Sequence, residues 1–405
     1  MITPAFKVYR YRWVVLAGFM LAVAFNQLLW ITFAPITGNA AAFYGVSDLS
    51  IGLLSMSFMI AYLFISFPAS WAIDTYGFHA AVGLGAVLTG IFGLIRGLVA
   101  GDYTLVLLAQ IGIAIGQPFI LNAVTKVAAR WFPLNERATA SGLGSLAIYV
   151  GILAGLALTP FLTLQVGLER MLLLYGVGSV LAGAFFLGVA RERPPTPPGP
   201  PELEERTLVL EGLRQVLRKK DFLALMLVFF IGLGVFNSVT TWIEDIVRPR
   251  GFSITEAGIT GGLMIAGGVF GALVLPGLSD RYRKRIPFIM LALAGALPGL
   301  AGVTFATTAG LLYAAAFLLG FCLLSSGPIG FQYGAEIARP TPEGTSNGLL
   351  LLMGQISGIA FIFAMDSLKV ATTGSMTPSL IALIVLMGVA LLAATRLRES
   401  ALLSG

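Results

Sequence analysis

The chain has 405 residues, of which 57% are hydrophobic and only 11% are charged. A soluble domain carries roughly 25% charged residues, so this composition indicates a chain surrounded by a bilayer. One Cys excludes a disulfide framework, and one His excludes paired-histidine metal sites. The formal charge of +6 does not indicate nucleic-acid binding, because the basic residues follow a membrane topology.

Twelve apolar stretches reach the length of about 20 residues that a transmembrane helix needs. The predicted spans are 12–40, 49–73, 79–100, 104–129, 137–164, 168–190, 222–247, 254–279, 286–306, 311–336, 345–368 and 376–396. The first follows a basic flank and has no small-residue cleavage site, so we expect a retained span rather than a signal peptide. The fold class that follows is an all-α membrane protein with twelve transmembrane helices.

Lys and Arg residues predict the orientation of these spans, because cytoplasmic segments are enriched in them. Placing both termini and the even-numbered loops inside assigns 20 of the 25 basic residues to the cytoplasmic side. The five left in the outer loops are Arg96, Arg170, Arg248, Arg250 and Lys369. We therefore expect a multi-pass protein of the plasma membrane, or of the bacterial inner membrane, with both termini cytoplasmic.

One long polar segment, residues 191–221, follows the sixth span. Within it, PPTPPGPP should be extended and semi-rigid. The stretch LEERTLVLEGLRQVLRKK has apolar residues at helical spacing, which predicts an amphipathic helix on the cytoplasmic surface. The expected organisation is an N-terminal six-helix bundle over 1–190, a cytoplasmic linker with this helix over 191–221, and a C-terminal six-helix bundle over 222–405.

The two halves share short sequences at a constant offset of 206 residues, which favours a duplicated six-helix unit. Asp74 corresponds to Asp280, and ATASGL (138–143) corresponds to GTSNGL (344–349). Two parallel repeats with a site at their interface describe the major facilitator architecture, in which the bundles are pseudo-symmetric. The sequences WAIDTYG (71–77) and GLSDRYRKR (277–285) resemble the loop signature of that superfamily.

This resemblance implies a gating role for the two loops, carried by Asp74, Gly77, Asp280, Arg281 and Arg285. Each Asp would cap a neighbouring helix N-terminus and pair with a cytoplasmic Arg in one conformation. The alternative for both is a solvated turn residue. The first copy of the motif is degraded, because it lacks cations that the second copy keeps.

Several polar side chains fall near the middle of predicted spans, where such residues usually face the interior or a water-filled cavity. They are Asn26, Gln27 and Trp30 in the first span, Gln117 in the fourth, Asn237 in the seventh and Gln355 in the eleventh. Asn26, Trp30 and Phe33 also have the spacing that places side chains on one helix face. This pattern predicts that the face looks into a central pocket.

Some of these residues have structural alternatives. Gln27 and Gln110 are interpreted as hydrogen-bonding residues between helices. For Asn122 the alternative is to satisfy carbonyls that Pro118 frees one turn earlier. For Trp30 it is a place in the aromatic belt at the membrane interface.

Ionisable residues are missing from the middle of the first and seventh spans. Glu244 lies at the outer end of the seventh and Glu336 near the inner end of the tenth, and both are candidates for proton coupling. Without an acid at the midplane, a proton symporter or antiporter is disfavoured. No central Arg or Lys awaits an anionic substrate either. Indole, Phe rings and amides suit a neutral solute or a soft organic cation held by cation–π contact.

Four stretches resemble the feline leukaemia virus subgroup C receptor-related branch of the major facilitator superfamily. They are YRWVVLAGFMLAVAFNQLLWITFAPI, FYGVSDLSIGLLSMSFMIAYLFISFPASWAIDTYG, GQPFILNAVTKVAARWFPLNERATASGLG and GFQYGAEIARPTPEGTSNGLL. That branch is associated with transport of choline, ethanolamine and, in some accounts, haem. Its bound choline is held by a Trp of the first span and a Tyr of the seventh, with Gln residues of the fourth and eleventh nearby.

Carried over by motif, the resemblance implies Trp30 in NQLLWIT, Gln117 in GQPFIL and Gln355 in EGTSNGLLLLMGQ as substrate contacts. The seventh span departs from the pattern, because GVFNSVTTW places Asn237 where the aromatic is expected. Half of the aromatic cage is then missing unless Phe236 or Trp242 substitutes. A smaller or more polar ligand than choline is the alternative.

The sequence therefore predicts a secondary transporter that moves a small organic cation, choline-like or ethanolamine-like, or a polar neutral solute by alternating access. Two alternatives stay open: a proton-coupled exporter of amphipathic drugs or metabolites, and a membrane receptor that transports nothing. An enzyme is not expected. We expect a monomer in the lipid bilayer with a small-molecule substrate, no nucleic-acid partner, no metal and no cofactor, since the lone His79 lies at the inner end of the third span.

Overall fold

A computed structural model describes residues 6–198, 214–339 and 343–399. The chain divides into two compact units, Met1–Glu204 and Glu205–Gly405. Within the described residues, 12 helices are long and apolar enough to cross a membrane, which confirms the predicted all-α class and number of spans. The first six lie in the first unit and the other six in the second.

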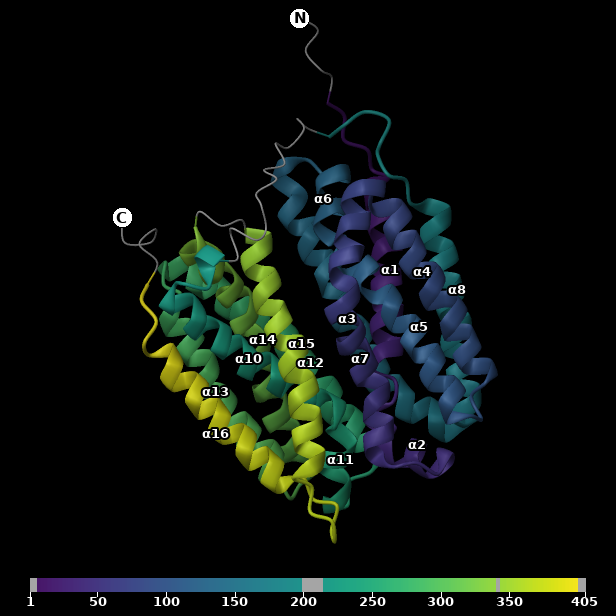
Figure 1. Ribbon diagram of the computed structural model, residues 1–405, viewed down its shortest axis with the longest axis vertical. Helices are drawn as coiled ribbons and strands as arrows, with labels where there is room; N and C mark the ends of the chain where they lie inside the picture. Colours follow the sequence, from purple (N-terminus) through teal and green to yellow (C-terminus); the bar gives the residue numbers. More distant parts are fainter. Residues whose placement is uncertain (1–5, 199–213, 340–342, 400–405) are drawn as a thin grey trace, which may run out of the picture. The chain divides into compact units, whose positions relative to one another are not determined.

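The first unit is built from helices joined by short connections (Figure 1). They are α1 (Arg12–Ile31), η1 (Ala34–Ile36), α2 (Thr37–Tyr44), α3 (Asp48–Tyr76), α4 (Phe78–Leu98), α5 (Tyr103–Leu121), α6 (Val124–Trp131), η2 (Leu134–Glu136), α7 (Arg137–Val166) and α8 (Leu168–Val189). Figure 1 shows α2 and α6 at opposite ends of this unit. The first and fourth spans are each interrupted, because α1 gives way to η1 and α2, and α5 gives way to α6.

Local sequence explains where several of these helices begin and end. The Ser47 side chain accepts the backbone N–H of Ser50 and caps α3, and Asp102 does the same for Leu105 at the start of α5. Gly77 has φ +87°, which a residue with a side chain rarely adopts, and it ends α3 and starts α4 within one residue. The second and third spans are therefore joined by this single residue.

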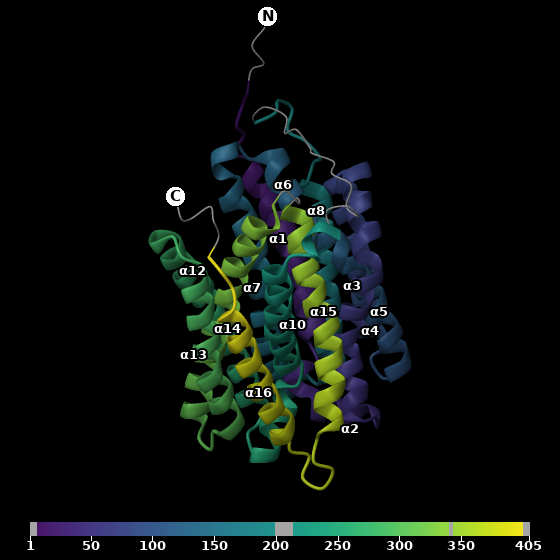
Figure 2. The same cartoon turned by 60° about the vertical axis from the view of Figure 1, so that its left-hand side comes forward.

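The second unit repeats this plan. It contains α10 (Lys220–Thr241), α11 (Ile243–Val247), η3 (Arg248–Arg250), α12 (Ile254–Tyr282), α13 (Ile286–Phe305), α14 (Ala309–Ala338), α15 (Glu343–Ser367) and α16 (Thr377–Ala394). In Figure 2, α12, α13 and α14 lie together, and α14 packs against both of the others. At the start of α12, Ser253 and Glu256 exchange hydrogen bonds with each other's backbone in a capping box.

The offset of 206 residues read from the sequence recurs in the helix boundaries. Helix α3 runs from Asp48 to Tyr76, and α12 runs from Ile254 to Tyr282. Helices α5 and α14, and helices α7 and α15, also begin 206 residues apart. The two units therefore share the same order and spacing of helices through their central spans.

Small residues set the closest helix contacts, as is usual where lipid supplies no hydrophobic force between helices. In the second unit, a Cβ at Gly320 would overlap the carbonyl oxygen of Met264, so α14 approaches the backbone of α12 directly. In the first unit, a buried apolar cluster that includes Phe19, Phe78 and Phe186 joins α1, α4 and α8. These contacts give each unit a packed interior in which polar side chains must find partners.

The linker predicted over 191–221 is described only in part. Most of LEERTLVLEGLRQVLRKK lies outside the described residues, so the amphipathic helix stays a prediction. Residues 214–216 are helical, and Val216 is buried.

Candidate functional site

Trp30 lies one residue before the end of α1 and is 6% exposed. Its indole Nε1–H donates to the carbonyl oxygen of Ser55 on α3, at 3.2 Å. The donor of the ring is therefore satisfied inside the first unit. An indole held by its N–H keeps a fixed orientation and can offer a ligand only the rest of the ring.

The neighbouring amide, Asn26, is fully buried and turned toward α4. Its Nδ2 donates to Thr89 Oγ1 at 3.1 Å, and its Oδ1 accepts from Gln27 Nε2 at 3.2 Å. The hydrogen bond of Gln27 thus stays within α1, whereas the sequence predicted a bond between helices. Because Asn26 has partners on both atoms of its amide, its contact with a substrate stays a prediction.

Arg96 corrects the sequence analysis, which counted it in an outer loop. It belongs to the last turn of α4, and its side chain is fully buried. Its Nη1 donates to Leu29 O at 3.0 Å and to Gln110 Oε1 at 2.7 Å, and its guanidinium carbon lies 5.7 Å from the centre of the Phe33 ring. Phe33 therefore faces a cation of its own unit. The sequence did indicate this position, because the predicted span 79–100 includes Arg96.

Gln117 of α5 is 7% exposed and directly precedes Pro118, which lies inside the helix. One turn on, Asn122 marks the break between α5 and α6. Its Nδ2 donates to the hydroxyls of Ser66 and Ser70 on α3, and its Oδ1 accepts from Tyr62 at 2.8 Å. Asn122 thus joins the broken fourth span to α3 by side-chain hydrogen bonds, and the alternative of local carbonyl capping is not what the structure shows.

In the second unit, two predicted substrate contacts come together where α10 packs against α15. Asn237 Nδ2 donates to the carbonyl oxygen of Gly354 at 3.1 Å, and Gln355 is the next residue along α15. Asn237, Gln355 and Phe236 are all half-buried. Trp242 is fully buried and donates its indole N–H to Ile362 O at 3.2 Å, so of the two possible aromatic substitutes Phe236 is the more accessible.

The two gating loops differ from the predicted scheme, because each helix start is capped by a Glu that the sequence analysis did not consider. Glu192 accepts the backbone N–H of His79 in the first turn of α4, at 2.9 Å. Glu399 accepts the N–H groups of Arg285 and Ile286 at the start of α13, each at 3.0 Å. Gly77 is needed at the first site, since a Cβ there would overlap the Glu192 carboxylate.

Both predicted Asp residues form ion pairs within their own units, and for Asp280 the partner is an Arg, as the resemblance implied. Asp74 pairs with Lys126 at 3.1 Å, and Asp280 pairs with Arg285. Arg285 also bonds to Glu336, whose Oε1 lies 3.1 Å from its Nη2. Burial opposes the charge of this guanidinium, but its bonds to Asp280 and Glu336 raise the pKa of Arg285 above its ordinary value, so it stays cationic. Arg281 is exposed.

The two candidates for proton coupling are both held in ion pairs. Glu336 accepts from Arg285 and from Gln332 Nε2 on its own helix, at 3.1 Å. Glu244 is 2% exposed on α11, and its Oε2 lies 3.0 Å from Arg248 Nη1. Each of the two carboxylates therefore has a cationic partner within its own unit.

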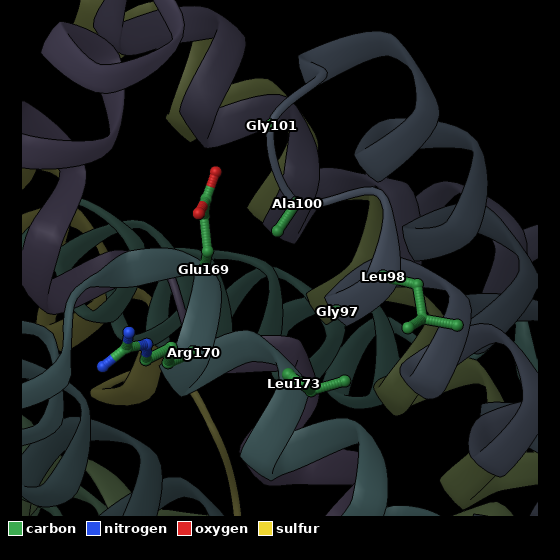
Figure 3. A pocket seen from close by; sticks show the side chains of 7 residues that line it. All are labelled: Gly97, Leu98, Ala100, Gly101, Glu169, Arg170 and Leu173. Carbon is green, nitrogen blue, oxygen red and sulfur yellow. The ribbon is translucent and has the colours of Figure 1, made fainter.

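A shallow pocket of about 310 Å³ lies at the ends of α4 and α8 (Figure 3). Its lining residues are Gly97, Leu98, Ala100, Gly101, Glu169, Arg170 and Leu173. In Figure 3 the Glu169 carboxylate points toward the turn at Ala100 and Gly101, whereas Arg170 points away from it. None of the predicted substrate contacts lines this pocket, so it is separate from the candidate site.

Apolar helices in two repeated units, each with buried polar side chains, define a multi-pass membrane protein. The model of the Major Facilitator Superfamily matches residues 16–362, and the chain belongs to this superfamily. The chain is thus a transporter rather than an enzyme. Among solved structures, a bacterial homologue of the human lysosomal transporter Spinster shares the fold with a TM-score of 0.79 and 19% identity, over 96% of this chain and 98% of that one. A D-xylose–proton symporter gives a TM-score of 0.74 at 14% identity, over 97% and 99%.

Curated relatives place the chain in the expected branch. It is 32% identical to solute carrier family 49 member A3 of Xenopus tropicalis, over 91% of this chain and 80% of that protein. It is 29% identical to the choline/ethanolamine transporter FLVCR1 of Felis catus, over 88% and 68%. It is 28% identical to the choline/ethanolamine transporter flvcr2b of Danio rerio, over 89% and 78%. The resemblance to the feline leukaemia virus receptor-related branch is confirmed.

Proposed function

We propose that this protein is a facilitative transporter of a small organic cation of the choline or ethanolamine type, which it moves by alternating access without proton coupling. A polar neutral solute of similar size is the second candidate for the same site. The names of the FLVCR-related relatives support the substrate class. The residues proposed to bind it are Trp30 and Gln117 of the first unit, and Phe236, Asn237 and Gln355 of the second.

The observation that carries this proposal is the state of Trp30. Its N–H is bonded to Ser55 O, so the indole has no donor left for a substrate. What the ring can still offer is its π face, which attracts a quaternary or primary ammonium group and is the strongest such face among the aromatic residues. A buried indole with its N–H occupied therefore suits a soft cation better than it suits an anion or a sugar.

The amides supply the complementary polar contacts. Asn237 donates through Nδ2 to Gly354 O, which leaves its Oδ1 to accept a hydrogen bond. A choline hydroxyl and an ethanolamine ammonium are both donors that fit such an acceptor. Because an amide oxygen is neutral, it can hold the donor without trapping the cation, and release stays fast enough for transport.

Arg96 is a buried cation that donates to the carbonyl of Leu29, the residue before Trp30, and its charge has to be reconciled with a cationic substrate. The guanidinium is directed to the carbonyl of Leu29 and to Gln110, on the side of α4 and α5. The indole of Trp30 is directed to α3. The guanidinium of Arg96 and the indole of Trp30 thus point to different helices. The Leu29 carbonyl and the Phe33 ring stabilise the charge of Arg96.

The ion pairs of Glu336 and Glu244 favour transport that is independent of protons. A coupling carboxylate must change its protonation as access alternates. Glu336 is engaged by Arg285, and Glu244 by Arg248, so protonation of either would break a salt bridge. The transport of a cation would then be driven by its own gradient and by the membrane potential.

The test is binding and flux with a matched pair of ligands. Purified protein should be stabilised against thermal unfolding by choline, and proteoliposomes should take up labelled choline or ethanolamine. The neutral isostere 3,3-dimethylbutan-1-ol, which has the shape of choline without its charge, should neither stabilise the protein nor compete. Trp30→Ala should abolish both effects, whereas Trp71→Ala, at a 56% exposed indole on α3, should leave them intact.

Two outcomes would overturn parts of this proposal. If the neutral isostere competes as well as choline, the substrate is a polar neutral solute rather than a cation. If Trp30→Ala leaves every binding effect unchanged, the site lies elsewhere in the chain.

A further inference from the structure

Arg96 and Gln110 form a buried clamp on the carbonyl of Leu29. Arg96 Nη1 donates to this oxygen at 3.0 Å, and Gln110 Nε2 donates to it at 3.2 Å. The two side chains also bond to each other, because Arg96 Nη1 lies 2.7 Å from Gln110 Oε1. Both are fully buried. One backbone oxygen of α1 is thus held from α4 and from α5 at the same time.

The clamped carbonyl lies where α1 ends. The last four carbonyls of a helix have no partner in the helix, and in hydrocarbon no water can replace one. Helix α1 ends at Ile31, and Pro35 follows in η1, so Leu29 is among these residues. The Leu28 carbonyl accepts instead from Thr32 Oγ1 at 2.8 Å. Side chains therefore satisfy the end of α1.

The charge of Arg96 suits this position. A helix C-terminus carries a partial negative charge that stabilises a nearby cation. Within the described part of the chain, Arg96 forms no salt bridge with a carboxylate, and its partners are Leu29 O, Gln110, Thr32 and the Phe33 ring. A buried guanidinium that serves only packing would be a poor choice in a membrane, because an apolar side chain would avoid its desolvation. The hydrogen bonds that Arg96 donates to Leu29 O and to Gln110 are what distinguish it from an apolar side chain at this position.

The clamp acts on the residue that we propose as the substrate contact. Trp30 follows Leu29 directly, and its indole is bonded on the other side to Ser55 of α3. The peptide group between these residues is therefore held from α4 and α5, while the ring that it carries is held from α3. Since the helix is interrupted two residues later, no continuous turn of α1 fixes the backbone beyond Ile31.

We infer that Arg96 and Gln110 are positioning residues that hold the interrupted end of α1 and thereby set the orientation of the Trp30 indole for substrate. The expected effect of these residues on transport rests on the proposed function. Its structural part concerns Trp30 alone and can be tested without any substrate.

The first experiment measures the environment of Trp30 in the full-length protein without ligand. The emission of Trp30 is obtained as the difference between each protein and the same protein carrying Trp30→Phe. Arg96→Gln and Gln110→Leu should raise the acrylamide quenching constant of this emission about twofold, as expected when a held segment opens locally. Arg96→Lys, which keeps the charge but loses the fork of donors, should lie between these variants and wild type.

The matched control is Arg250→Gln. Arg250 also donates to carbonyls at a helix end, those of Thr304 and Ala306 beside α13, but it belongs to the second unit. Its replacement should lower the melting temperature without changing the Trp30 signal. If Arg96→Gln does not yield folded protein, Gln110→Leu decides the question. Unchanged quenching of Trp30 in every folded clamp variant would overturn the inference.

The second experiment measures flux in proteoliposomes. Clamp variants should raise the KM for choline about tenfold while the maximal rate changes less, because a misplaced indole weakens binding first. If wild type shows no choline-dependent flux, the proposed function fails, and the quenching measurement still decides whether the clamp exists. If wild type transports choline and clamp variants keep its KM despite altered quenching, the positioning role is wrong.

Discussion

Glu192 caps the start of α4 by accepting the backbone N–H of His79, a residue 113 positions earlier in the chain. Glu399 does the same for α13, 113 positions after Ile286. In each unit, a carboxylate that follows the last span closes the first turn of the third span. The equal separations show that this contact belongs to the repeat and joins the end of each unit to its middle.

Loss of this cap should destabilise the protein. Glu192→Gln removes the charge that the start of α4 favours, and Glu192→Ala also removes the acceptor. We expect the alanine variant to lose about 1 kcal/mol of stability, as is typical of a helix cap. Thermal unfolding of the purified protein measures this loss. Glu169→Gln, at the exposed pocket of Figure 3, is the control and should change little. Equal melting temperatures for Glu192→Ala and wild type would contradict the capping role.

Arg285 should be far more sensitive to substitution than its partner Asp280. The Arg285 and Glu336 side chains are 9% and 7% exposed, so Arg285→Ala leaves Glu336 buried without its partner at a cost of about 3 kcal/mol. The Asp280 side chain is 68% exposed, and Asp280→Asn should cost less than about 1 kcal/mol because water screens that pair. Chemical denaturation or thermal melting of both variants in one detergent gives the comparison. Similar losses in the two variants would show that Glu336 does not depend on Arg285.

Cation uptake should respond to voltage and not to pH. An inside-negative potential contributes about 2.3 kcal/mol per charge per 100 mV, which corresponds to an accumulation ratio on the order of 50-fold for a monovalent cation. Valinomycin-imposed potassium gradients in proteoliposomes test the first part, and pH jumps at fixed voltage test the second. Glu336→Gln should keep the voltage response. A flux that follows the pH gradient and disappears in this variant would favour the proton-coupled exporter instead.

Asn237 should determine the preference between choline and ethanolamine. In the proposed site its free Oδ1 accepts a hydrogen bond, which an ethanolamine ammonium can donate and a trimethylammonium group cannot. Asn237→Tyr would replace the amide by an aromatic ring and should shift the ratio of KM values toward choline by about fivefold, the scale of one cation–π contact. Competition uptake with both ligands measures the ratio. Asn122→Gln, at the polar link between α3 and the fourth span, should not alter this preference. An unchanged ratio in Asn237→Tyr would remove Asn237 from the site.

The spans and the repeat could be predicted from sequence because they depend on local composition. A stretch of apolar residues long enough to cross the bilayer has few alternatives to a helix. Likewise, the offset of 206 residues between Asp74 and Asp280 is also the offset between the boundaries of α3 and α12. These features need no knowledge of which side chains meet.

The contacts of the buried polar residues could not be predicted in the same way. Arg96 was assigned to a loop because it lies near the end of its span. Its hydrogen bonds to the Leu29 carbonyl and to Gln110 of another helix are not marked by any sequence pattern. The caps formed by Glu192 and Glu399 were missed because residues more than a hundred positions apart provide them. For Asn122, proximity to Pro118 suggested a local role, whereas its partners lie on α3.

The cap at α4 also has a consequence for biogenesis. When the third span has just been synthesised, Glu192 has not yet been made. The backbone N–H of His79 at the start of α4 therefore lacks this acceptor until the sixth span is complete. The contact between Glu192 and α4 therefore forms only after all six spans of the first unit have been made.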